Sequence, residues 1–155
     1  MRKLIGKIIE WFLDYPHTVL FTNDGSGKMP DHTYDGDAGY DLYCSCDIII
    51  PAHSNVNVPS GICIQSNDRL WFELKARSST MRKKGLQVID AVIDNDYTGK
   101  MFACVYNPSD EDKLVLAGDR LAQVVPMRLI RCNFKLVDNL KERSRGSNGF
   151  GSTGR

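Results

Sequence analysis

Residues 70–75 have the sequence LWFELK, in which Leu70, Phe72 and Leu74 alternate with three more polar or amphipathic residues. Successive side chains of an extended chain point to opposite faces, so these three apolar residues share one face. A period of two over six residues is typical of a β-strand with one buried side. The stretch therefore predicts a strand in a protein with a β-sheet core.

Short apolar runs of the same kind continue on both sides of this strand, and turn residues such as glycine, proline and Asn-Asp pairs separate them. The runs cover residues 19–21, 48–50, 55–58, 62–65, 87–89, 101–106, 114–116, 121–125 and 129–137. Many short strands without an internal repeat predict one all-β domain, built as a sandwich, a jelly roll or a barrel.

The composition is that of an ordinary globular protein. The chain has 155 residues, of which 42% are hydrophobic and 25% charged, and its formal net charge is +1. This near-neutral balance argues against a nucleic-acid partner, because proteins that coat nucleic acids carry an excess of Lys and Arg. The five cysteines are odd in number and lack CxxC spacing, which disfavours a disulfide framework and favours a reducing compartment. We therefore expect a cytoplasmic protein, in the host cytoplasm if a phage encodes it.

Two terminal segments differ from the predicted β domain of residues 16–142. Residues 1–15 place apolar side chains at helical spacing and predict an amphipathic helix that ends before Pro16. This helix is too short and too charged to span a membrane, and no cleavage site follows it. We expect it to pack on its own domain or on a neighbouring subunit; the alternative is a docking surface for a partner protein or a membrane. Residues 143–155 contain four glycines and predict a flexible C-terminal arm.

Three segments carry side chains that strand packing does not need. Residues 76–85 combine hydroxyl groups with four cations directly after the strand at residues 70–75, which suits phosphate oxygens as well as a solvated basic turn. Residues 91–99 place Asp94 and Asp96 in a predicted hairpin, where a carboxylate could take a proton from water or simply close an Asx turn. In the arm, Phe150 could stack on a base. Together the three segments predict a nucleoside triphosphate site.

The chain resembles the homotrimeric dUTP diphosphatase (dUTPase) family from about residue 19 to residue 155. All five family motifs occur in order. They correspond to residues 37–43 (DAGYDLY), residues 77–79 (RSS) with Gly85, residues 92–99 (VIDNDYTG), residues 118–123 (GDRLAQ) and residues 145–154 (RGSNGFGSTG). Five motifs in register are a specific signal.

The resemblance implies a fold, an activity and an assembly. The fold would be a β-clip or jelly-roll-type barrel, and the activity would be Mg²⁺-dependent hydrolysis of dUTP to dUMP and pyrophosphate. Such an activity limits the incorporation of uracil into DNA and supplies dUMP for dTMP synthesis. Each active site of the homotrimer would combine motifs from all three subunits, with the arm of one chain closing the site of a neighbour.

The resemblance also implies a role for individual residues. Asp94 would be the general base for the water that attacks the α-phosphate, and Tyr97 would pack under the deoxyribose and exclude a 2′-hydroxyl. The other predicted substrate-binding residues are Arg77, Ser78, Ser79 and Gln123 at the phosphates, Ala91, Val92 and Ile93 at the uracil, and Arg145, Phe150, Gly151 and Ser152 in the arm. Asp41 and Asp96 would have supporting roles. Mg²⁺ would bind through the substrate phosphates without a direct protein ligand.

The chain departs from the family pattern in the segment that would bind uracil. Ala91 stands where glycine is usual, and the stretch from Gly85 to Asp94 is shorter than in common family members. Asp90 could therefore contribute a side-chain contact to the base. His17, His32 and His53 lie outside every motif, so we interpret them as structural or surface residues.

Two alternative functions are compatible with the same scaffold. The related dCTP deaminases need a glutamate at the position of Cys104, which makes deamination improbable here. The second alternative is a regulatory protein that binds other proteins and uses residues 1–15 as its interaction surface. The five intact motifs favour catalysis.

Overall fold

The fold was analysed in a computed structural model, which describes residues 17–66, 69–144 and 146. The predicted helix at residues 1–15 and the arm residues Arg145, Phe150, Gly151 and Ser152 lie outside this part of the chain. The strands are β1 (Val19–Asn23), β2 (Tyr40–Tyr43), β3 (Ile48–Ile50), β4 (Asn55–Ser66), β5 (Leu70–Ala76), β6 (Gln87–Val88), β7 (Ala91–Ile93), β8 (Lys100–Tyr106), β9 (Lys113–Val115) and β10 (Arg120–Arg128). One helical turn, η1 (Thr80–Lys84), follows β5.

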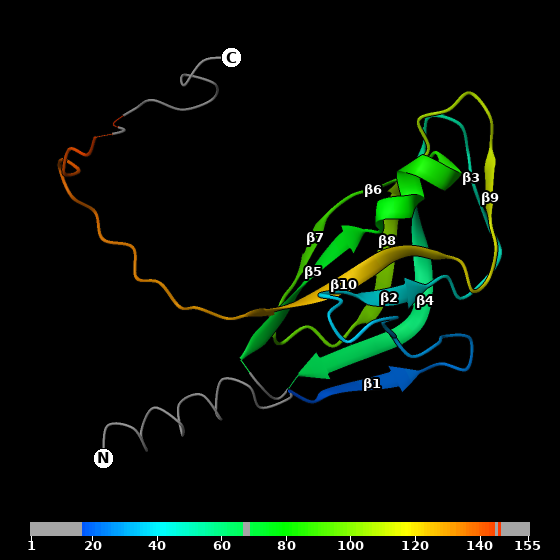
Figure 1. The fold of residues 1–155 in the computed structure, drawn as a ribbon, viewed down its shortest axis with the longest axis horizontal. Helices are drawn as coiled ribbons and strands as arrows, with labels where there is room; N and C mark the ends of the chain where they lie inside the picture. The colour runs from blue at the N-terminus through cyan, green and yellow to red at the C-terminus, as the bar shows by residue number, and fades with distance from the viewer. Residues whose placement is uncertain (1–16, 67–68, 145, 147–155) are drawn as a thin grey trace.

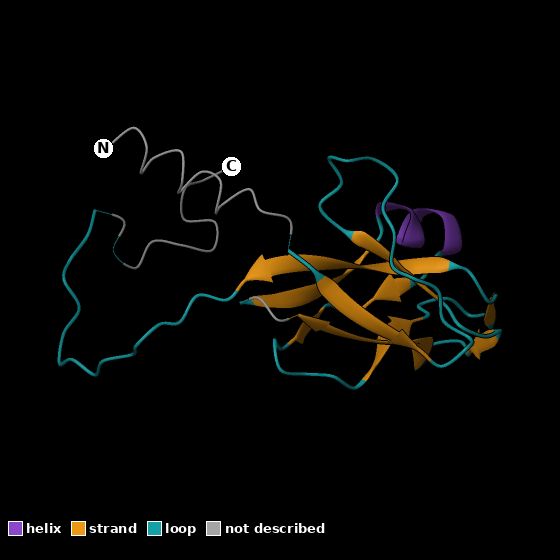
Figure 2. Ribbon diagram, turned by 90° about the horizontal axis from the view of Figure 1, so that it is seen from below, coloured by secondary structure: helices purple, strands orange, loops and turns teal. Residues whose placement is uncertain are grey.

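The strands form two four-stranded antiparallel sheets and one small two-stranded sheet (Figures 1 and 2). The first sheet has the order β1-β4-β8-β6 and the second the order β2-β10-β5-β7, while β3 pairs with β9. Apolar side chains from all three sheets are buried together. The predicted all-β fold class is confirmed.

The strand that the sequence predicts at residues 70–75 is β5. Leu70, Phe72 and Leu74 are 4%, 4% and 1% exposed, so their shared face lies in the core. β5 is also the centre of the site, because it pairs with β10 on one side and with β7 on the other. Its neighbours on both sides carry residues of the predicted motifs.

The strand predicted at residues 129–137 is wrong for the isolated chain. After β10 the chain leaves the body of the domain without regular structure (Figures 1 and 2), and Phe134 and Leu136 are 100% and 97% exposed. A strand needs a neighbour to pair its backbone groups, and beyond the bond from Leu129 N to Arg69 O at 2.8 Å no strand of the described chain pairs with residues 129–137.

The hairpin predicted around residues 91–99 is also wrong. β7 pairs with β5 in the second sheet, whereas β8 pairs with β4 and β6 in the first. The intervening segment therefore crosses from one sheet to the other instead of joining two paired strands. No helix in the described ranges is long and apolar enough to cross a lipid bilayer.

Candidate active site

The predicted base and the predicted sugar-contacting residue line the same cavity. This cavity, which we call the nucleoside cavity, has a volume of about 240 Å³. Its wall consists of Ala91, Val92, Ile93, Asp94, Tyr97, Lys100, Met101, Phe102 and Cys104. The structure thus brings together all five residues that the sequence assigns to the base, the sugar and the attacking water.

Asp94 stands at the end of β7, where the chain turns away from β5. Its backbone carbonyl accepts a hydrogen bond from Tyr97 N at 3.1 Å, and Asn95 Nδ2 donates to Leu70 O at 2.6 Å. These bonds fix the turn to the first residue of β5. Within the described ranges, no group donates a hydrogen bond to the Asp94 carboxylate, which is therefore free to accept a proton from water.

The Tyr97 ring is held by its own turn. Its hydroxyl donates to Lys100 O at 3.0 Å. A Cβ atom added at Gly99 would lie 2.5 Å from the Tyr97 hydroxyl oxygen, which is closer than side-chain atoms approach one another. Glycine at position 99 therefore lets the ring lie flat against the backbone on the wall of the cavity.

The predicted phosphate-binding residues line a second cavity, which we call the phosphate cavity. It has a volume of about 360 Å³, and its wall consists of His32, Thr33, Asp37, Ala38, Gly39, Asp41, Arg77, Ser78, Gln123 and Val125. Residues from three of the predicted motifs meet here because β10 pairs with both β2 and β5. Gln123 lies opposite Asp41 in one pairing and opposite Lys75 in the other.

A buried carboxylate organises the charges of the phosphate cavity. Asp41 is 6% exposed and binds two arginines, with Arg77 Nε on Oδ1 and Arg120 Nη1 on Oδ2 at 3.0 Å. A buried carboxylate is tolerated only when it is paired and hydrogen-bonded. Arg77 and Arg120 put two positive charges against the one negative charge of Asp41, which suits a phosphate group, although Asp37 on the same wall offsets this local balance.

The chain that follows β5 is anchored to β10. Arg77 N and Thr80 Oγ1 both donate to Leu121 O, at 3.2 and 2.6 Å. The predicted basic turn is in fact the helical turn η1, and Ser79 precedes it. Ser78 lies on the wall of the phosphate cavity, whereas Ser79 and Asp96 line neither cavity. Their predicted roles stay predictions.

The side chain of Gln123 is packed against the backbone of the first motif. Its Nε2 donates to Ala76 O at 3.2 Å. A Cβ atom on Gly39 would overlap the Gln123 amide, so only glycine permits this close approach. The amide is thus fixed between β5 and the turn before β2.

Two ion pairs stabilise the surroundings of the site. Burial by itself would raise the pKa of Asp119, but hydrogen bonds from Lys84 Nζ at 2.7 Å and from Leu116 N at 3.0 Å outweigh it and lower the pKa. Asp119 therefore stays ionised and ties η1 to the start of β10. The hydrogen bond to Asp90 at 2.7 Å raises the pKa of Lys75. The Asp90 carboxylate is thus paired with Lys75, which disfavours the predicted contact to the base.

Asp94 and Arg77 lie at opposite ends of β5. Ile93 of β7 is paired with Phe72 of β5. Because the two strands are antiparallel, the next residue, Asp94, would lie beside Trp71 in the same register. Arg77 follows the last residue of β5, six residues further along. At about 3.3 Å per strand residue, Asp94 and Arg77 of one subunit are about 20 Å apart. One phosphate chain cannot reach both groups in the same subunit.

Sequence reasoning missed two residues at the phosphate cavity. His32 lies on its wall, edge-on to the Tyr40 ring with a centroid distance of 5.0 Å. Arg120 belongs to the fourth motif, but only the tertiary structure shows that it binds Asp41. No sequence signal distinguishes Arg120 from an arginine at the start of a strand that has no carboxylate partner.

The carboxylates of the phosphate cavity are already engaged. Asp41 holds two arginines, and Asp37 Oδ2 accepts hydrogen bonds from Thr33 N and Tyr34 N at 3.1 and 3.0 Å. Within residues 17–66, 69–144 and 146, no three His, Cys, Asp or Glu side chains gather as metal ligands. The donor set fits a metal ion that is held by phosphate oxygens.

Solved structures with the same fold come from phages. A dUTPase of Staphylococcus bacteriophage 80alpha, solved with dUpNHpp, has a TM-score of 0.83, with 20% sequence identity over 89% of this chain and 99% of that chain. The D95N mutant of the dUTPase from phage phi11 of S. aureus, whose structure shows a structural Mg(II) ion, has a TM-score of 0.73 and 18% identity over 79% of this chain and 97% of that one.

Curated relatives are closer in sequence. The deoxyuridine 5'-triphosphate nucleotidohydrolase of Paramecium bursaria Chlorella virus 1 is 34% identical over 129 residues, which cover 83% of this chain and 92% of the relative. The Saccharomyces cerevisiae protein of the same name is 37% identical over 118 residues, or 76% and 80% of the two chains. The family model for dUTPase matches residues 26–154. The chain therefore belongs to the dUTPase family.

Proposed function

We propose that the protein hydrolyses dUTP to dUMP and pyrophosphate. The observation that carries the proposal is the arrangement of the motifs: Asp94 and Tyr97 share one cavity, while Arg77, Ser78 and Gln123 share another, in which two arginines flank Asp41. Membership of the dUTPase family and the names of the relatives support the same activity. The activity would limit uracil in DNA and supply dUMP for dTMP synthesis, and we propose a cytoplasmic location for it.

In the proposed reaction, the Asp94 carboxylate accepts a proton from water as the water oxygen attacks the α-phosphorus. The bond from the α-phosphorus to the bridging oxygen breaks, and pyrophosphate leaves with the electron pair. Phosphoryl transfer depends chiefly on positioning and on neutralisation of charge. Arg77 and Ser78 would hold the phosphates, and the unpaired Asp94 carboxylate would act as the base.

The uracil would be recognised by the backbone of β7. In the part of the chain that the structure describes, this strand pairs with β5 on one side and with no strand on the other, so the other edge presents N–H and C=O groups of residues 91–93. Uracil offers an N–H donor flanked by two carbonyl acceptors, whereas cytosine lacks that donor. When an analogue leaves the polar groups of such a site without hydrogen-bond partners, the site discriminates against that analogue by about 10⁴-fold.

Mg²⁺ would bind mainly through the three phosphates of the substrate, since the neighbouring carboxylates are engaged. Bound there, the ion would neutralise negative charge on the polyphosphate. The residues of this chain that hold the phosphates would thereby hold the ion indirectly.

A pyrophosphate-release assay with dUTP, dTTP, dCTP and UTP, each with and without Mg²⁺, tests the proposal. We expect release from dUTP alone, with strong dependence on Mg²⁺. Ammonia release from dCTP, or equal turnover of all four nucleotides, would overturn it.

Replacing Tyr97 by alanine should relax the choice of sugar. The ring stands on the cavity wall beside Asp94, so its removal opens space for a 2′-hydroxyl. We expect Tyr97→Ala to raise kcat/KM for UTP relative to dUTP by about tenfold or more, the effect of losing 1.4 kcal/mol of discrimination. Tyr97→Phe is the matched control, since it keeps the ring and loses only the hydrogen bond to Lys100 O. An unchanged UTP to dUTP ratio in Tyr97→Ala would show that another group selects the sugar.

We further propose that the active site is shared between subunits of a homotrimer. The separation of about 20 Å along β5 keeps Asp94 from the phosphate cavity of its own chain. A complete site therefore needs the nucleoside cavity of one copy beside the phosphate cavity of another. Such a site needs at least two copies of the chain, and the resemblance to the homotrimeric dUTPase family implies three.

The exposed segment after β10 supports such an assembly. Ile130, Phe134 and Leu136 are 78%, 100% and 97% exposed and are spaced by even numbers, so they share one face of an extended chain. Exposed apolar side chains of this kind mark an interaction surface. We propose that residues 129–137 dock as a strand on a second copy.

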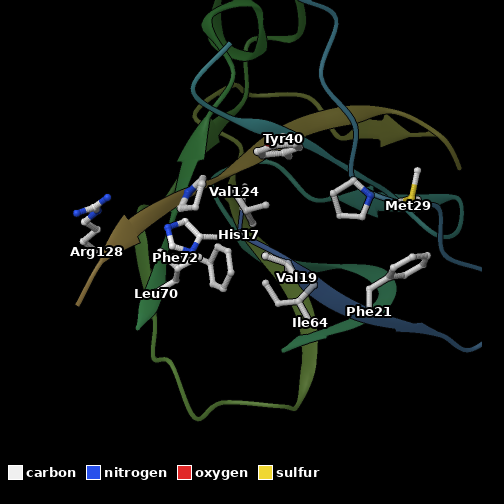
Figure 3. Close-up of a pocket in the computed structure, with 12 residues that line it drawn as sticks. His17, Val19, Phe21, Met29, Tyr40, Ile64, Leu70, Phe72, Val124 and Arg128 are labelled. Atoms are coloured by element: carbon white, nitrogen blue, oxygen red, sulfur yellow. The ribbon is translucent and has the colours of Figure 1, made fainter. Parts of the chain in front are cut away.

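An apolar groove on the domain fits this segment (Figure 3). Its volume is about 560 Å³, and Val19 and Phe21 of β1 face Tyr40, Phe72 and Val124 across it. Among the described residues, β1 pairs with β4 alone, so its other edge carries backbone donors and acceptors that no described strand uses. A strand added there would satisfy the backbone of β1 and fill the groove with apolar side chains.

A charge on the docking segment should break the assembly. Phe134→Asp would place a carboxylate in the apolar groove, at a cost of several kcal/mol. We expect monomers by light scattering and a loss of dUTP hydrolysis that follows the loss of trimer. Leu140→Asp makes the same change in the same exposed tail but outside residues 129–137, and it should keep the oligomer. A trimeric Phe134→Asp protein would contradict this docking.

A further inference from the structure

Arg120 is placed to control how Arg77 meets the substrate. It is the first residue of β10 and pairs in register with Tyr43 of β2. The register shifts between Arg120 and Ala122, so the strand is bulged at this point. A bulge redirects a side chain relative to a regular strand, and Arg120 reaches across to the carboxylate of Asp41.

Asp41 divides its two oxygens between two arginines. Oδ1 binds Nε of Arg77, and Oδ2 lies 3.0 Å from Nη1 of Arg120. Within the described ranges, the two Nη atoms of Arg77 have no partner. Arg77 lies on the wall of the phosphate cavity, so these two nitrogens are the donors that remain for a phosphate.

Without Arg120, the same carboxylate would compete with the substrate. A guanidinium and a carboxylate prefer a bidentate pair with two parallel hydrogen bonds. If Oδ2 lost its partner, it would be free to accept from an Nη atom of Arg77. That second bond would take a donor away from the phosphate, and the loss of Arg120 itself would remove one positive charge from beside the cavity.

We infer that Arg120 is a positioning residue for the triphosphate: by holding Asp41 Oδ2, it keeps the Nη donors of Arg77 available for phosphate. Arg120 acts through Asp41 and need not touch the substrate. The inference deepens the proposed function and rests on the assignment of this cavity to phosphate.

Binding of dUpNHpp and of inorganic triphosphate, measured by calorimetry, tests the inference. We expect Arg120→Gln to raise the Kd of both ligands by about tenfold, the cost of one hydrogen bond to a charged group. Arg120→Lys keeps the charge and one donor for Oδ2 and should restore most of the affinity. Lys113→Gln removes one positive charge from β9, at a residue that lines neither cavity nor the apolar groove, and should bind both ligands as the wild type does.

A double-mutant cycle separates positioning from a simple loss of charge. Arg77→Lys removes the guanidinium fork, so Arg120→Gln should weaken binding in that background by less than about twofold. Equal losses in both backgrounds would overturn the inference, as would unchanged triphosphate binding in Arg120→Gln. A wild-type protein that binds inorganic triphosphate but does not hydrolyse dUTP would count against the proposed function and leave the role of Arg120 standing.

Discussion

Asp94→Asn should lower kcat for dUTP by about 10²–10⁴-fold, the usual contribution of a general base. Asparagine has the shape of aspartate but cannot accept the proton of the attacking water. The carboxylate is exposed at the nucleoside cavity and has no hydrogen-bond donor among the described residues, so the exchange should disturb no contact that folds the chain. The Kd for dUpNHpp should therefore stay within about threefold of the wild-type value.

The measurement is steady-state pyrophosphate release combined with calorimetric binding of the analogue. Asp110→Asn is a suitable control, because it makes the same change at a carboxylate that is 97% exposed and paired with His53, outside both cavities. Near-normal turnover in Asp94→Asn would refute the proposed base. A loss of analogue binding as large as the loss of turnover would assign Asp94 to substrate binding instead.

A chain that ends at Ser144 should lose most of its activity. It lacks Arg145, predicted to bind the γ-phosphate, and Phe150, predicted to cap the uracil. A hydrogen bond to a charged group contributes about 1.5–3 kcal/mol and a base-stacking aromatic ring about 1–3 kcal/mol. Together these terms predict a loss in kcat/KM of about 10²–10⁴-fold.

The truncated protein should remain a trimer, since it keeps the docking segment at residues 129–137. Light scattering measures the oligomeric state. The single variants Arg145→Gln and Phe150→Ala show how much of the loss in kcat/KM comes from the phosphate contact and how much from the base contact. Full activity in the truncated trimer would show that the arm does not take part in turnover.

The sequence was sufficient for the local features of this fold. The alternation at residues 70–75 predicts β5, and the short motifs mark Asp41, Arg77 and Gln123 as site residues, whereas only the pairing of β10 with β2 and β5 shows that the three meet. The strand and the individual site residues depend on the chain's own periodicity and on short motifs. They are therefore visible without a structure.

Features that depend on contacts between distant segments could not be predicted. The alternating pattern of residues 129–137 is that of a strand, but no strand of the described chain pairs with it. The link between Arg120 and Asp41 spans 79 positions of the sequence, and no local pattern announces it. The segment after Asp94 resembles a hairpin turn in composition, whereas it joins two different sheets.

The length of β5 has a genetic consequence if sites are shared in this way. A polypeptide damaged at Asp94 and another damaged at Arg77 would each be inactive alone, yet a mixed assembly could pair an intact half from each. Two defective alleles could then complement one another in the same cell. A single defective allele would inactivate those shared sites to which its product contributes a damaged half.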